Sequence, residues 1–144
     1  MSTIVKFFVA PDDASAALVV GTGPGRAVRS LSFGNFDSEE AVVEWECLFS
    51  GGSFEELAEA GEPRIVAGED NGGCVVFAFS ARLVDALAEA EPSRLREVAM
   101  AWARQRAEDG EAIASDVAGE IVGSLGSLVR GTEEHGHGLY CWVA

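Results

Sequence analysis

The sequence predicts an α+β fold: a single domain over residues 1–144, with a mostly antiparallel sheet packed by four to five helices. Three observations predict it. A length of 144 residues suits one domain with its own core. Strand-like patterns stand at both ends of the chain and in a hairpin pattern between them. Helical periodicity fills much of the rest, and no internal repeat or linker divides the chain.

The first third is predicted to be mainly extended. Residues 2–10 are rich in β-branched and aromatic side chains, which is typical of a strand. Residues 15–21 fit either a second strand or the end of a short helix, and residues 26–34 alternate as a half-buried strand does. The glycine-rich residues 21–25 lack the third glycine of a dinucleotide-binding loop and the lysine of a phosphate-binding loop. We therefore expect a turn there.

Two helices and a hairpin are predicted next. Residues 38–49 have helical spacing, with Asp37 or Ser38 as the cap and a Gly-Gly pair after the last turn. Residues 53–63 begin with a capping box and end in a glycine and a proline. Residues 64–80 contain two apolar runs around an Asn-Gly pair, a strong hairpin pattern.

Three helices and a strand are predicted to close the chain. The helices occupy residues 80–92, 93–110 and 111–131, and the strand occupies residues 138–144. The third helix contains three internal glycines, each of which weakens a helix by up to about 1 kcal/mol relative to alanine. We expect close packing of a neighbouring element to compensate. The predicted inward stripe of this helix is Ile113, Val117, Ile121, Leu125 and Leu128.

Charge excludes several classes of partner. The formal net charge of −14 disfavours binding to nucleic acid and to anionic membrane surfaces, which require Lys and Arg. Between Arg29 and Arg64 there is no basic residue, and this stretch is strongly acidic. Its negative field could steer a basic partner, although a solvated, solubilising surface explains it as well. The candidate partner-binding residues are Glu39, Glu40, Glu44, Glu46, Glu55, Glu56 and Glu59.

The cysteines and the lack of a long apolar run favour the cytoplasm. The three cysteines are odd in number and lie among apolar residues, as buried free thiols do. No apolar run approaches the roughly 20 residues of a membrane span, and the N-terminal apolar patch is too short for a signal sequence.

Two further clusters of polar residues could bind a ligand. His135 and His137 share one side of an extended segment, and Glu133 could complete a three-ligand metal site; a polar loop entering the last strand is the simpler explanation. Arg94, Arg96, Arg104 and Arg106 form a basic patch that could bind an anion, pair with the acidic helices or face water.

Parts of the chain resemble a known family. The segments "ECLFSGGSFE", "GEPRIVAGEDNGGCVVFAFSARLVDALAEAEPSRLREVA" and "HGHGLYCWVA" resemble the YfbM-like bacterial proteins over residues 44–144. The resemblance implies a small cytoplasmic α+β protein. It carries over no catalytic residue, because the shared positions are mainly core and turn residues.

Two functions from different classes follow. The first is a non-catalytic protein-interaction module whose acidic helices bind a basic protein partner. The alternative is a metal- or small-ligand-binding domain, with possible hydrolytic activity, centred on His135 and His137. A homodimer through the terminal strand or the glycine-containing last helix is compatible with either. No catalytic residue and no cofactor are predicted.

Overall fold

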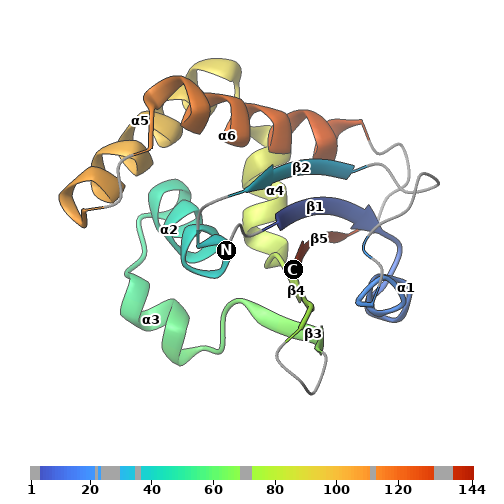
Figure 1. Cartoon of the computed structure of the whole chain (residues 1–144). Helices are drawn as coiled ribbons and strands as arrows, with labels where there is room; N and C mark the ends of the chain where they lie inside the picture. Colours follow the sequence, from blue (N-terminus) through green and yellow to red (C-terminus); the bar gives the residue numbers. More distant parts are fainter. Residues whose placement is uncertain are drawn as a thin grey trace.

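The computed structural model describes residues 4–21, 23, 30–34, 37–68, 73–110, 113–131 and 138–144. Within these ranges the chain forms an antiparallel five-stranded sheet and six helices, which confirms the predicted α+β fold (Figure 1). In chain order the elements are β1 (Ile4–Ala10), α1 (Asp13–Ala17), β2 (Ser30–Gly34), α2 (Ser38–Ser50), α3 (Phe54–Glu59), β3 (Arg64–Gly68), β4 (Val75–Ala78), α4 (Ala81–Glu89), α5 (Pro92–Glu108), α6 (Ser115–Arg130) and β5 (Gly138–Val143).

The first helix resolves an alternative that the sequence left open. Residues 15–21 fitted a strand or a helix end, and the structure has the short helix α1 there. The Asp12 side chain accepts a hydrogen bond from the Ser15 N–H at 2.8 Å, which caps this helix. Of the glycine-rich turn predicted at residues 21–25, only Gly21 and Gly23 lie within the described residues.

The sheet has the strand order β2-β1-β5-β4-β3, and all neighbouring strands are antiparallel. The predicted hairpin is confirmed, since β3 pairs with β4; its Asn-Gly turn lies outside the described residues. The C-terminal strand β5 is central and is hydrogen-bonded on both sides, by β1 and β4. The terminal strand therefore has no free edge to which a strand of a second copy could pair.

One face of the sheet carries most of the apolar core. Phe7 of β1, Phe77 of β4 and Cys141 of β5 are fully buried there, in one cluster with apolar residues of α2, α4, α5 and α6. Trp45 of α2 and Trp102 of α5 meet at a ring distance of 5.1 Å in an edge-to-face arrangement. This contact holds α2 against α5, so it also sets the position of the polar side chains beside it.

The helix α6 packs closely at one of its three glycines. A Cβ at Gly126 would lie 2.9 Å from Leu95 Cδ1 of α5, so the lack of a side chain allows the two helices to approach. Gly119 and Gly123 have no such neighbour, so close packing does not explain them. Val117 was predicted to point inward but is 44% exposed, because the buried side of α6 runs through Ala118, Ile121, Val122 and Leu125 and leaves Val117 outside it.

The opposite face of the sheet is covered more thinly. Phe8, Tyr140 and Trp142 form a smaller cluster with α1 and the residues after it. The Trp142 Nε1–H donates to the Val20 carbonyl at 2.9 Å, and Tyr140 donates its hydroxyl hydrogen to Asp13 at 2.9 Å. Gly23 has φ of +79° and lies against the Trp142 ring, where a side chain would be strained and crowded.

The structure bears on two further sequence-based expectations. All three cysteines are free, as predicted, and Cys141 is buried. Among the described helices, none has both the length and the apolar character that crossing a lipid bilayer requires.

Candidate functional site

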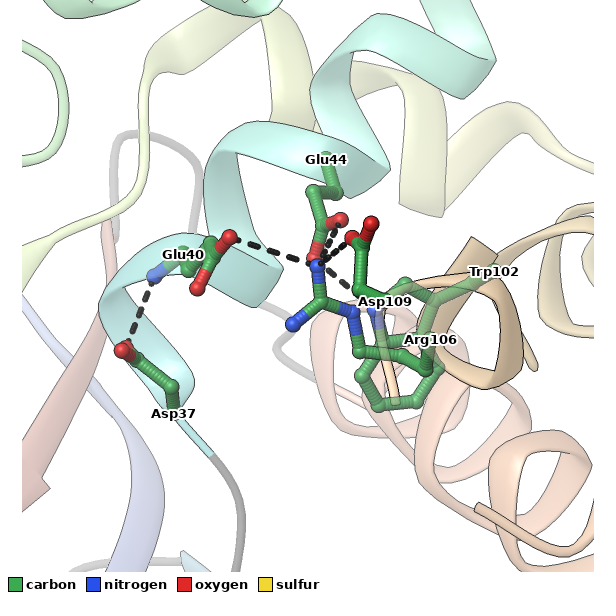
Figure 2. Close-up of polar contacts among 6 residues, drawn as sticks. All are labelled: Asp37, Glu40, Glu44, Trp102, Arg106 and Asp109. Carbon is green, nitrogen blue, oxygen red and sulfur yellow. Dashed lines mark hydrogen bonds and ion pairs between the residues drawn. The ribbon is translucent and has the colours of Figure 1, made fainter. Parts of the chain in front are cut away.

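The candidate site contains two carboxylates that project from the same side of the first turns of α2. The Asp37 side chain caps this helix by accepting a hydrogen bond from the Glu40 N–H at 3.1 Å. Glu40 and Glu44 are four residues apart, so both project from the same side of α2. That side faces α5, as Figure 2 shows.

Arg106 of α5 lies at the centre of the site. Its side chain is only 5% exposed, and its Nη2 lies 2.6 Å from Glu44 Oε2, 2.9 Å from Asp109 Oδ2 and 3.3 Å from Glu40 Oε1 (Figure 2). Trp102, one turn earlier on α5, donates its indole N–H to Glu44 Oε1 at 3.3 Å. Both oxygens of the buried Glu44 carboxylate therefore have a donor, as buried carboxylates require.

The three carboxylates outnumber the single guanidinium, so the cluster keeps negative charge at neutral pH. Burial raises the pKa of Glu44, and the nearby Arg106 guanidinium opposes that shift. Glu40 and Asp109 are much more exposed, with 39% and 62% of their side chains accessible. The excess negative charge is thus directed toward solvent.

A cleft of about 380 Å³ opens beside this cluster. Its walls come from α2, α5 and the start of α3. Gly51 ends α2 in the left-handed conformation, with φ of +78°, and Ser53 then caps α3. This sharp turn brings Phe54 to the cleft, where it is 44% exposed. The residues that line the cleft are Glu40, Glu44, Cys47, Gly52, Phe54, Gln105 and Asp109.

Carboxylates this close together can also hold a metal ion. One oxygen from each of Glu40, Glu44 and Asp109 lies within 4.8 Å of the other two. Oxygen ligands of this kind suit hard divalent cations. Here, however, the Arg106 guanidinium lies within hydrogen-bond distance of all three, so a metal ion would compete with a cation that the chain itself supplies.

The predicted acidic residues divide into two environments. Glu39 is exposed, Glu40 is partly exposed, and Glu55, Glu56 and Glu59 of α3 are exposed. We refer to these five residues together with Asp109 as the acidic surface. Glu44 and Glu46 are buried, at 8% and 5% exposure, so the expectation that they lie on a solvated surface is wrong.

Glu44 and Glu46 can be buried because each carboxylate accepts hydrogen bonds from donors in distant elements. Glu44 has Arg106 and Trp102, and Glu46 accepts a hydrogen bond from the Ser80 hydroxyl, which also caps α4. Arg106 likewise differs from the other predicted patch residues, because Arg94, Arg96 and Arg104 are exposed. The proposed pairing of this patch with the acidic helices holds for Arg106.

Sequence reasoning missed Asp109, Phe54 and Gln105 as site residues and left the environment of Arg106 open. One signal could have placed Arg106. Leu95, Ala99 and Trp102 follow the inward stripe of α5, and Arg106 continues it at the next helical position. A cation on an apolar stripe requires a buried anion, and the nearby acidic helix offers one.

The predicted histidine site cannot be compared with the structure. Glu133, His135 and His137 lie outside the described residues, and the metal-binding hypothesis on them stays a prediction. Cys141, four residues after His137, is buried, and burial raises its pKa far above the ordinary value of a thiol. A thiol in this state is a poor nucleophile at neutral pH.

Comparison with known proteins adds no relative. No protein-family model, curated protein or solved structure matches the chain. The function must be argued from the site itself.

Proposed function

We propose that the protein is a non-catalytic interaction module of the bacterial cytoplasm that binds a basic protein partner through its acidic surface. The cleft between α2, α3 and α5 supports this function best. Three carboxylates face one guanidinium there, and exposed carboxylates of α3 continue the negative charge beyond it. A cationic side chain of a partner would find unneutralised carboxylates at the opening.

Phe54 adds an apolar contact to this charged surface. Phe54 is 44% exposed and lines the cleft together with Glu40 and Asp109. Arginine suits such a surface, because its guanidinium can stack on an aromatic ring while it donates two parallel hydrogen bonds to a carboxylate. The carboxylates of this cluster already bind one guanidinium of the chain, since Arg106 Nη2 lies within hydrogen-bond distance of all three.

The cytoplasmic setting is part of the proposal. It is supported by three free cysteines in a chain of 144 residues, since reducing compartments keep thiols unpaired. The bacterial origin rests on the resemblance to the YfbM-like proteins.

The test uses a capped, arginine-rich peptide as a defined basic probe, with a glutamate-rich peptide of equal length as the negative control. Glu55→Gln/Glu56→Gln/Glu59→Gln is expected to weaken binding of the basic peptide by about tenfold or more, and salt to weaken wild-type binding strongly. Fluorescence anisotropy measures both effects.

A second triple variant separates a local site from general charge. Glu89→Gln/Glu91→Gln/Glu120→Gln removes the same charge from exposed positions on or beside other helices. We expect this control to bind the peptide nearly as tightly as the wild type does. Equal losses in the two triple variants would show that only net charge matters, and the proposal would fail.

A further inference from the structure

The outer side of α5 carries positive charge, in contrast to the acidic surface. Arg96, Met100 and Arg104 follow one another at intervals of four residues, and all three are exposed, Met100 by 52%. Side chains at this interval lie on one side of a helix, and the two arginines stand about 12 Å apart along its axis. We call these three residues the α5 ridge.

Within the described parts of the chain, the cations of this ridge have no internal partner. Arg64, Arg94, Arg106 and Arg130 each donate hydrogen bonds to an acceptor in the same chain. Arg82, Arg96 and Arg104 make no hydrogen bond and no ion pair with any described residue, and of these three only Arg96 and Arg104 lie together on one side of one helix. Two arginines around an exposed methionine are an unusual surface in a chain with a net charge of −14.

The acidic surface is complementary to this ridge in charge and in apolar character. On the acidic side, the exposed Phe54 lines the cleft together with Glu40 and Asp109, and Glu55 follows it in α3. On the ridge, an exposed thioether stands between two guanidinium groups. Methionine sulfur packs favourably against aromatic rings, and arginine pairs with carboxylates.

We propose that the basic partner of the acidic surface is a second copy of this chain, which docks its α5 ridge there. This inference rests on the proposed function and names its partner. Both complementary surfaces belong to one sequence, so every copy carries an α5 ridge and an acidic surface that can bind the ridge of another copy. The net negative charge of each copy does not prevent the contact, because at physiological salt charges beyond about 8 Å are largely screened while touching pairs are screened less.

Charge reversal on each surface tests the contact. Arg96→Glu/Arg104→Glu makes the ridge acidic, and Glu55→Arg/Glu59→Arg makes the α3 side basic; all four positions are exposed, so the fold should survive. Sedimentation velocity is expected to show concentration-dependent association of the wild type and at least about tenfold weaker association of each variant alone. An equimolar mixture of the two variants should associate again, because the unaltered acidic surface of the ridge variant can bind the unaltered ridge of the α3 variant, and the two reversed surfaces also attract each other.

Three results would overturn the inference: a wild type that stays monomeric at all concentrations, variants that associate as the wild type does, or a mixture that does not recover. Circular dichroism and urea unfolding of both variants confirm that the fold is intact. The arginine-rich peptide separates this failure from failure of the proposed function. If the peptide binds the wild type and the ridge variant while neither self-associates, the acidic surface is a binding site for another basic protein.

Discussion

The carboxylates of α2 and α3 come from one acidic stretch of sequence, and they lie in opposite environments. Glu44 and Glu46 of α2 are buried and hydrogen-bonded by α4 and α5. Glu55, Glu56 and Glu59 of α3 are exposed to solvent. The comparison teaches that acidic residues close together in sequence can divide into those that stabilise the fold and those that are available to a partner.

The difference arises from what each helix packs against. The helix α2 lies against α4 and α5, whose Ser80, Trp102 and Arg106 supply donors to its carboxylates. The helix α3 contributes no buried residue and contacts mainly α2. Burying a charge without a partner costs several kcal/mol, so only the helix with donors opposite can bury its carboxylates.

Among the substitutions that test this comparison, Arg106→Met is expected to change the free energy of unfolding most. The substitution leaves the Glu44 carboxylate buried without its cation, which should lower the free energy of unfolding by about 3 kcal/mol or more. Urea unfolding measures the change. Arg104→Met, two positions earlier and exposed, is the matched control and should stay within about 0.5 kcal/mol of the wild type. Similar results for the two variants would show that the buried pairing does not stabilise the fold.

Glu44→Ala should have the next largest effect. It removes the oxygen that accepts from the Trp102 indole and one of the three carboxylates that bind the Arg106 guanidinium, and losing the acceptor of a buried donor costs about 1–3 kcal/mol. Glu44→Gln keeps the shape and one acceptor oxygen and should lose clearly less. Chemical denaturation of both variants at neutral pH checks the order. A Gln variant as unstable as the Ala variant would mean that the charge of Glu44 matters more than its hydrogen bonds.

The pH dependence of stability, compared between the wild type and Glu44→Gln, tests the charge of Glu44 separately. Burial raises the pKa of Glu44 above its ordinary value of 4.5, so the folded state holds this proton more tightly than the unfolded state does. The contribution of Glu44 to stability is therefore present below that ordinary value and is lost as pH rises through the raised pKa. We expect the wild type to lose stability relative to Glu44→Gln across this window, measured by urea unfolding in a series of buffers. A relative gain would show that the attraction of Arg106 outweighs desolvation.

Ser80→Ala tests the second buried carboxylate. The hydroxyl caps α4 by accepting from the Leu83 N–H at 3.1 Å and also donates to Glu46. Loss of the cap alone costs about 1 kcal/mol, and Glu46 loses its donor in addition. Thermal unfolding should show a lower midpoint than in Ser53→Ala, which removes the cap of α3 alone. Equal midpoints would assign the whole effect to capping.

The smallest effect on stability is expected from Glu55→Gln/Glu56→Gln/Glu59→Gln. These side chains are exposed, so the free energy of unfolding should change by no more than about 0.5 kcal/mol. The same variant is expected to lose most of its peptide binding. A large loss of stability would mean that α3 carboxylates stabilise the fold, and the contrast between the two helices would disappear.

The sequence by itself determined most of the secondary structure, because the signals are local. The caps Asp37 and Ser53, the glycines after α2 and the period of α5 each act within a few residues of the element they define. The apolar stripe of the last helix also predicted that Ile121, Leu125 and Leu128 form part of the core, although Val117 of the same stripe is exposed. The α+β class follows from these local patterns together with the length of the chain.

The tertiary structure alone decided which carboxylates are buried. Glu44 and Arg106 are 62 residues apart, and the cleft combines α2, α3 and the last turn of α5. The environment of a charge depends on the donors brought opposite it by packing, and no local pattern in α2 distinguishes Glu44 from Glu40. The same is true of β5: its residues predicted a strand, but only the order of the sheet placed that strand at the centre, where it cannot pair with another copy.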